Sequence, residues 1–441
     1  MNGVLKFVWP VVSLDATHLR SEHNGTLYVA SVLSGCNDIF PIGFTICAGN
    51  EDGATWKKML ELLKKACPII DDQRYGDTDT DSVARPPFLF ILARDKGLKE
   101  SLKAVFPKKY KMSCARHIQA NVTQKFGKQC AKFVCLIAKS FSTRNASLLL
   151  DEIRKVKPEA ATYLESITTS GVLWRSTQWY SDSPSPSPAQ LPPRYGIVTS
   201  NTSESANSML SEARNLGWLE AVNKILDIMT TRVCTCRRKY ASRDGSEVVP
   251  RVAQILKRRW DAAASMTVDE IEVGCGDFKV VEPISIVDEN GDDNVQRMAR
   301  SYGDPDRVLV VKPYLEWCSC GVWQDFLYPC RHACAVFRKW EEKEFNYVLR
   351  SLVHPFYTFE FVHNTFKKNI FPVCLETTVY DGETKEPDMP KRQSGRPKTK
   401  RIRKRSKFIV AEDSPVKCSV CGKRGHNRRT CPNVVGSNDN K

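Results

Sequence analysis

Long hydrophobic runs are absent from this sequence. No apolar stretch approaches the ~18–20 residues that a helix needs to span a bilayer. The apolar stretch 4–14 is short, lacks a basic leader and runs straight into Asp15. It therefore predicts a buried strand and not a signal peptide, and we expect no membrane partner.

A disulfide framework is also not expected. Seventeen cysteines occur in 441 residues without a secretory signal, which favours reduced thiols in a cytosolic or nuclear protein, several of them bound to metal. The length leaves room for two or three domains, and the hydrophobic content of 41% supports a buried core.

Acidic residues are scarce at the C-terminal end. Residues 391–441 hold 16 Lys+Arg and 3 Asp+Glu, whereas the remainder holds 50 and 47. A nearly neutral body therefore carries a strongly basic tail, which is the electrostatic footprint expected for a polyanion such as DNA.

The most basic part of the tail is 391–407, with ten basic residues and no acidic ones. Its segment 395–398 (GRPK) resembles an AT-hook core, which lays an arginine in a narrow minor groove, although Ser394 stands where that motif prefers arginine. A nuclear-localisation signal and a solvated charge run are the other interpretations, and we expect a nuclear protein. The candidate nucleic-acid contacts in the tail are basic: Arg396, Lys398, Arg401, Arg403, Lys404, Arg405, Arg428 and Arg429.

Two pairs of metal ligands lie upstream of the tail. Cys318 and Cys320 are separated by nine residues from Cys330 and His332. Zinc binds thiolate and imidazole tetrahedrally, and a closed Cys₃His set makes a structural site. Buried free cysteines are the alternative, but two pairs with one-residue spacing favour zinc.

The residues around these ligands, 317–323 (WCSCGVW) and 329–333 (PCRHA), resemble a SWIM zinc finger. That resemblance implies a function in nucleic-acid binding, and contacts with protein partners are a second possibility.

A second zinc site is predicted in the tail. Cys418, Cys421, His426 and Cys431 have the spacing of a CCHC zinc knuckle. Knuckles bind single-stranded DNA or RNA, usually by stacking bases on aromatic side chains. This one has no aromatic residue between its ligands, so we expect weak, sequence-tolerant and salt-sensitive binding. A knuckle that contacts only protein is the alternative.

Hydrophobic periodicity predicts an α/β fold. Apolar strands are expected at 8–14, 27–33, 39–47 and 87–92, with helices at 51–66 and 96–105. Helices are expected through most of 117–175 and again over 202–239, and strand-like segments over 271–311. The order of these elements, three strands followed by a helix, a strand and a helix, is compatible with a ribonuclease-H-like mixed sheet. We expect this sheet to carry an inserted helical region and to be followed by small zinc-stabilised modules.

These patterns divide the chain into six parts. They are a first part of the ribonuclease-H-like core (1–117), a helical insertion with a Ser/Pro-rich loop (118–195), a helical completion of the core (196–240), a β-rich segment (265–340) with the SWIM finger at about 305–340, a basic disordered linker (381–410) and the CCHC knuckle (415–434).

Several motifs, in this order, resemble the Mutator-like (MULE) transposases. The resemblance covers roughly residues 8–340 and rests on 12–19 (VSLDATHL), 39–44 (IFPIGF), 95–98 (DKGL), 114–118 (CARHI) and 195–207 (YGIVTSNTSESAN). It implies a DDE nuclease, in which three carboxylates hold two Mg²⁺ or Mn²⁺ ions for attack at a phosphodiester.

The implied catalytic set is incomplete in this chain. Asp15 corresponds to the first carboxylate and Glu204 to the third. The position of the second is Ala93, and Asp95 lies two residues later, roughly 6.6 Å along a strand. We therefore expect a transposase core that has lost catalysis. Without the resemblance, Asp15 and Glu204 would be ordinary polar residues.

Three functional hypotheses remain open at this point. The first is a zinc-binding, nucleic-acid-binding protein on a transposase body that no longer cuts. The second is an active transposase that uses Asp15, Asp95 and Glu204 with divalent metal. The third is a scaffold that contacts proteins through the SWIM finger. Asp15 lies so early in the sequence that the upstream DNA-recognition domain of the family is expected to be missing.

Overall fold

The structure is a computed structural model that describes residues 5–21, 25–71, 86–92, 97–180, 192–283, 307–340, 342–367 and Cys421. The chain divides into two units, Met1–Pro390 and Lys391–Lys441. Of the second unit, Cys421 is the described residue.

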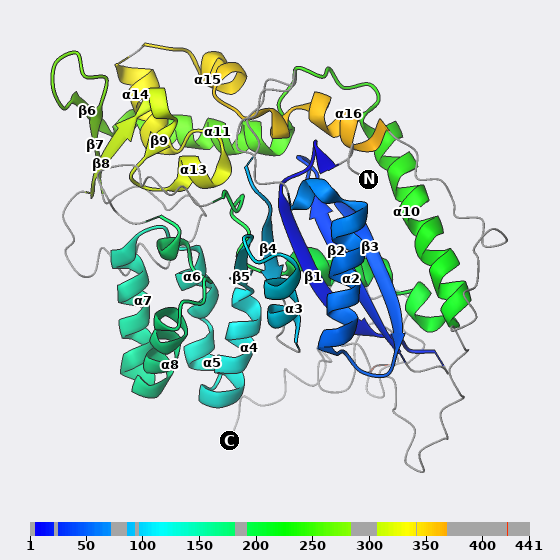
Figure 1. The fold of residues 1–441 in the computed structure, drawn as a ribbon. Helices are drawn as coiled ribbons and strands as arrows, with labels where there is room; N and C mark the ends of the chain where they lie inside the picture. The colour runs from blue at the N-terminus through cyan, green and yellow to red at the C-terminus, as the bar shows by residue number, and fades with distance from the viewer. Residues whose placement is uncertain are drawn as a thin grey trace. The chain divides into compact units, whose positions relative to one another are not determined.

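A five-stranded mixed sheet forms the centre of the first unit (Figure 1). Its strand order is β3-β2-β1-β4-β5. The first three strands pair antiparallel, and β4 and β5 run parallel to β1. The strands are β1 (Val11–His18), β2 (Gly25–Leu33), β3 (Ile39–Ala48), β4 (Leu89–Leu92) and β5 (Tyr110–Ser113). The expected α/β class with a mixed sheet is confirmed.

The first strand is longer than its apolar pattern predicts. Its pairing with β2 continues as far as His18 opposite Thr26, so the polar residues after Leu14 also belong to the strand. Asp15 therefore lies within β1 and not at its end. The strand β5 was not predicted, because its four residues are mostly polar and its partner β4 defines it.

Helices cover both faces of this sheet. On one face α2 (Gly53–Ala66) begins after Asp52, whose side chain accepts a hydrogen bond from Thr55 N, and it packs against α3 (Leu98–Val105). On the other face lie α9 (Asn201–Met209) and the long α10 (Trp218–Tyr240). The strand β2 contributes apolar side chains to both faces of the sheet. Tyr28 and Ala30 belong to one apolar cluster, and Leu27 and Val29 belong to another.

Helices occur over most of 117–175, as expected, and they form a bundle with a core of its own. Figure 1 shows it in cyan and teal, beyond the β5 edge of the sheet. Its helices are α4 (Ala115–Phe126), α5 (Lys128–Ala131), α6 (Val134–Lys139), α7 (Thr143–Val156) and α8 (Pro158–Thr169).

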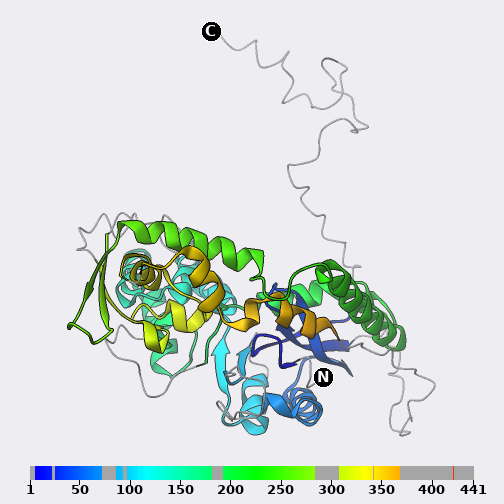
Figure 2. The same cartoon turned by 90° about the horizontal axis from the view of Figure 1, so that it is seen from above.

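A second, four-stranded antiparallel sheet has the order β6-β7-β8-β9. Its strands are β6 (Thr267–Glu270), β7 (Phe278–Glu282), β8 (Arg307–Lys312) and β9 (Trp317–Cys318). The helices around it, seen from above in Figure 2, are α11 (Pro250–Ala262), α13 (Val322–Phe326), α14 (Arg331–Lys339) and α15 (Phe345–Ser351). The last described helix, α16 (Phe359–Lys367), packs against α10 beside the central sheet (Figure 1).

One apolar cluster joins the two sheets. It includes Val12 and Leu14 of β1 together with Val280 of β7 and Val336 of α14. Short 3-10 helices connect other elements at Pro68–Ile70, Ser176–Gln178, Ala213–Asn215, Ala263–Ser265, Pro313–Leu315 and Pro355–Tyr357. Among the described helices, none has the length and apolar character to cross a membrane.

Candidate functional site

A strand, a turn and a helix of the second sheet region bring the predicted zinc ligands together. Cys318 is the last residue of β9, and Cys320 lies in the turn that leads into α13. Cys330 is the N-cap of α14, and His332 lies in the first turn of that helix. The turn after Cys320 uses Gly321 at φ +75°, where a Cβ would lie 2.4 Å from Cβ of Tyr180, so this position requires glycine.

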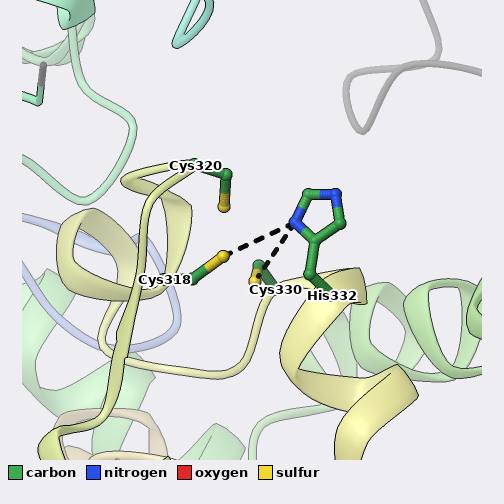
Figure 3. A group of neighbouring side chains, drawn as sticks. All are labelled: Cys318, Cys320, Cys330 and His332. Carbon is green, nitrogen blue, oxygen red and sulfur yellow. Dashed lines mark hydrogen bonds between the residues drawn. The ribbon is translucent and has the colours of Figure 1, made fainter. Parts of the chain in front are cut away.

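The ligand atoms of these four residues lie within 4.8 Å of one another, and all four residues are buried. Nδ1 of His332 lies 3.7 Å from Sγ of Cys318 and 3.7 Å from Sγ of Cys330 (Figure 3). Around a tetrahedral zinc with bonds of about 2.3 Å to sulfur and about 2.0 Å to nitrogen, a sulfur and a nitrogen ligand are about 3.5 Å apart. The donor set and its spacing therefore fit a structural Zn²⁺ ion.

The surroundings of the sulfur atoms favour their thiolate form once a cation is bound. Backbone N–H groups of Val322 and Ala333 donate to Sγ of Cys320 and Cys330, each over 3.4 Å. Burial and the neighbouring thiols raise the pKa of the Cys318 thiol well above its ordinary value. A bound divalent cation reverses that balance, because it stabilises the negative charge that burial disfavours.

A buried carboxylate orients the histidine. Oε2 of Glu282 lies 3.1 Å from Nε2 of His332, and Arg331 forms an ion pair with the same side chain. Burial acts to raise the pKa of Glu282, but His332, Arg331 and Arg307 outweigh it and lower that pKa to about 2. With its ring hydrogen on Nε2, His332 donates to this carboxylate and presents the Nδ1 lone pair to the three sulfurs.

Glu282 was missed in the sequence, although a signal is present there. In β7 the side chains of Phe278, Val280 and Glu282 alternate into the interior. An acidic residue at an inward position of an otherwise apolar alternation needs a buried partner, and here that partner is a zinc ligand.

A buried ion pair anchors the zinc region to the rest of the first unit. Arg194 and Asp325 of α13 are both fully buried, and the guanidinium donates to both carboxylate oxygens over 3.2 and 3.1 Å. The backbone N–H groups of Arg194 and Gly196 and the hydroxyl of Tyr180 also donate to this carboxylate. None of this was predicted, since the partners are 131 residues apart.

The structure places Asp15 and Glu204 on facing elements. Asp15 lies on β1, and Nδ2 of Asn207 on α9 donates to its Oδ2 over 2.8 Å. Burial raises the pKa of Asp15 to about 6, against the opposing effect of His117, and Glu51 and Glu204 contribute to the increase. Glu204 lies one turn before Asn207 on α9, where Nε of Arg116 approaches it to 3.8 Å.

The second carboxylate position lies outside the described residues. The strand β4 is described as far as Leu92, which pairs with Leu14, the residue before Asp15. Ala93 and Asp95 follow in the sequence but are among the residues that the structure leaves undescribed.

Most of the predicted tail sites also lie outside the described residues. These are the zinc ligands Cys418, His426 and Cys431 and the basic residues Arg396, Lys398, Arg401, Arg403, Lys404, Arg405, Arg428 and Arg429. Cys421 is described, in a turn and half-buried. The second zinc site therefore stays a prediction.

Comparison with known proteins adds one result. Residues 307–341 match the family model of the SWIM zinc finger, and the matched segment contains all four clustered ligands. No curated protein matches the chain. The chain therefore contains a SWIM zinc finger at residues 307–341, and its three cysteines and one histidine form a buried zinc-binding cluster.

Proposed function

We propose that this chain is a zinc-binding, nucleic-acid-binding protein of the nucleus, built on a Mutator-like transposase body that no longer cleaves DNA. The observation that carries the proposal is the buried Cys₃His cluster, which matches the SWIM finger. The basic tail supplies the charge for a nucleic-acid partner, because 391–407 holds ten basic residues and no acidic ones.

The transposase body is supported by the arrangement of the central sheet. Three antiparallel strands continued by two parallel ones, in the order β3-β2-β1-β4-β5, are the arrangement expected of a ribonuclease-H-like core. The two carboxylates implied by the resemblance lie on facing elements, Asp15 on β1 and Glu204 on α9.

The loss of cleavage is supported by the residue that follows β4. Leu92 pairs with Leu14, immediately before Asp15, and the next residue in the sequence is Ala93. A methyl side chain cannot coordinate the Mg²⁺ or Mn²⁺ ions that such nucleases use. An active enzyme would need Asp95 to replace it, and in that case Asp95→Asn would abolish cleavage that depends on divalent metal.

Nucleic-acid binding is tested by titrating labelled single-stranded and duplex DNA with the full chain at several salt concentrations. We expect retention at about 0.15 M salt and a linear fall of log K with log salt, with a slope near −0.9 per phosphate contact on duplex. A variant with Arg396, Arg401, Arg403 and Arg405 changed to Gln should bind more weakly, with a shallower slope. No retention of either DNA by the unmodified chain would overturn the proposal.

A protein-interaction scaffold is the second candidate, and one observation favours it. Ten large hydrophobic side chains are exposed among the described residues. Seven of them lie in the zinc region, at Ile271, Val273, Val308, Tyr314, Leu315, Trp340 and Tyr347. Exposed apolar side chains that gather in one region are typical of protein contacts. Failure to retain DNA, together with protein binding that Val273→Asp and Tyr314→Asp abolish, would favour this candidate.

A further inference from the structure

The first part of the helical insertion, as far as residue 150, lies in a stretch of the chain that has no acidic residues. Residues 101–150 contain ten Lys+Arg and not one Asp or Glu. The chain as a whole has 50 acidic residues in 441. The near-zero net charge of residues 1–390 is therefore an average, and this segment is much more basic than that average. The segment is folded, and it forms α4, α5, α6 and the first half of α7.

The exposed side of α4 carries hydrogen-bond donors and positive charge. Arg116, Asn121, Gln124 and Lys125 are exposed on it, whereas Ile118 and Val122 are buried. Arg, Lys, Asn and Gln side chains are the common donors to nucleic-acid phosphates and base edges. After Gly127 the chain turns back along α4 into α5, where Nε2 of Gln119 donates to the carbonyl of Ala131 over 2.9 Å. Lys128 and Lys132 are exposed there, beside α4.

The lysines of this surface have no ion-pair partner among the described residues. Nζ of Lys125 lies 4.4 Å from the ring centroid of Tyr163, and Nζ of Lys132 lies 4.6 Å from that of Phe133. Such contacts hold the aliphatic stem and the ammonium group in place without neutralising the charge.

Nearby acidic groups are mostly neutralised within the insertion. Asp151 and Glu165 pair with Arg154, and Glu152 pairs with Lys155. Glu159, in the first turn of α8, is exposed as well. The lysines at the end of α4 and on α5 therefore keep most of their positive field.

This surface begins beside Glu204 of α9 and near Asp15 of β1. Arg116, in the first turn of α4, approaches Glu204, and the neighbouring His117 acts electrostatically on Asp15. From Arg116 to Lys125 the helix rises roughly 14 Å, about four nucleotide steps of one B-DNA strand. Nine residues at 3.6 residues per turn also place Arg116 and Lys125 at opposite borders of the exposed side, so a strand would cross α4 obliquely from one to the other.

We propose that the exposed side of α4, continued by Lys128 and Lys132, binds the sugar-phosphate backbone of DNA and guides a strand toward Asp15 and Glu204. The proposal rests on the nucleic-acid-binding function proposed above and assigns a role to the insertion. It adds a folded, backbone-directed contact to the binding expected of the tail.

The test compares two variants of the full chain with the same change in charge. The first has Lys125, Lys128 and Lys132 changed to Gln. The control has Lys57, Lys58 and Lys65 changed to Gln, three exposed lysines of α2. Circular dichroism of both variants checks that the fold is kept, and duplex DNA affinity is measured as a function of salt.

Loss of three phosphate contacts should reduce the salt slope by about 2 to 3 and weaken binding at low salt by about tenfold or more. The control should match the unmodified chain within about twofold, since a distant charge acts only through the screened field. Lysine acetylation read by mass spectrometry gives a second measure, which the tail does not obscure. DNA should protect Lys125, Lys128 and Lys132 and leave Lys57 and Lys58 reactive.

The outcomes separate this proposal from the one on which it rests. The unmodified chain could bind DNA while the two variants have equal DNA affinity and DNA does not protect the α4 lysines. In that case the proposed DNA contact on α4 is wrong and the proposed function stands. If the unmodified chain does not bind DNA at all, both proposals fall.

Discussion

At the scale of single residues, Glu282 determines how His332 faces the zinc cluster. Its carboxylate lies 3.1 Å from Nε2, which leaves Nδ1 as the coordinating atom. Hydrogen bonds from histidine ligands to carboxylates fix the ring orientation and raise the basicity of the ligand. The cluster therefore depends on a residue that is not itself a ligand and lies 50 positions earlier in the chain.

The change Glu282→Gln should weaken zinc binding by about tenfold, because it removes the carboxylate charge and keeps a side chain of similar size. Competition with a zinc chelator measures the affinity. Asp269→Asn on the neighbouring strand β6 is the control, since Asp269 is exposed, and it should bind zinc like the unmodified chain. Equal zinc affinity of all three proteins would show that Glu282 does not orient the ligand.

The half-buried Asp15 predicts a dependence of stability on pH. Burial raises its pKa from 3.8 to about 6, so the folded chain retains this proton to higher pH than the unfolded chain does. Ionisation of Asp15 then costs stability as the pH rises from about 4 to 6, and the cost stays constant above that range.

Asp15→Asn removes this cost. Relative to the unmodified chain, the variant should gain about 1–3 kcal/mol in the free energy of unfolding between pH 4 and pH 7. Asn207 can still donate to the new amide oxygen. Urea unfolding at the two pH values measures the effect, and an identical difference at both would mean that Asp15 titrates normally.

At the scale of elements, the helix α13 holds the zinc finger against the segment that leads into α9. Asp325 on α13 accepts hydrogen bonds from the backbone of Arg194 and Gly196. A few residues later, the backbone N–H of Ser200 donates to Sγ of Cys114, the N-cap of α4. The finger is thus connected through one short segment to the two helices that bear Glu204 and His117.

Asp325→Ala should destabilise the chain by about 3–5 kcal/mol, because it leaves the Arg194 guanidinium buried without a counter-charge. The double change Arg194→Met with Asp325→Leu should recover much of that loss, since no buried charge remains. Chemical unfolding of the two variants and the unmodified chain measures both effects. A loss below about 0.5 kcal/mol for Asp325→Ala would mean that water reaches the pair and screens it.

Local patterns predicted the elements that have a clear apolar period. The helix predicted at 51–66 is confirmed as α2, and its buried residues Trp56, Met59, Leu60 and Leu63 have helical spacing. The zinc ligands follow from spacing too, because each pair closes within one turn. Local patterns did not predict the strand β5 or the continuation of β1 through Asp15. They also did not predict the partners of Glu282 and Asp325. Distant segments of the chain determine all of these features.

At the scale of the whole molecule, the zinc cluster is joined to the body by a common core. Cys318 and Cys330 belong to the same apolar cluster as Val12 and Leu14 of the central sheet. Because binding of structural zinc is coupled to folding, loss of the metal should also destabilise residues outside the finger. Limited proteolysis with and without a chelator would detect such an effect.

Native mass spectrometry of the full chain should find two zinc ions, one in the SWIM finger and one in the predicted knuckle. Cys330→Ser should lose the first and unfold the local module, and Cys421→Ser should lose the second. If the unmodified chain holds one zinc ion and Cys421→Ser holds the same one, the knuckle is disproved. Two zinc ions in Cys330→Ser would contradict the ligand set of the finger.

The most direct test of DNA binding without cleavage is one gel assay. Supercoiled plasmid is incubated with the zinc-loaded full chain and Mg²⁺ or Mn²⁺, and half of each sample is deproteinised before electrophoresis. We expect the untreated plasmid to be retarded and the deproteinised plasmid to remain supercoiled. Nicked plasmid that appears with the unmodified chain and disappears with Asp15→Ala would contradict the proposed loss of catalysis, and plasmid that is never retarded would contradict binding.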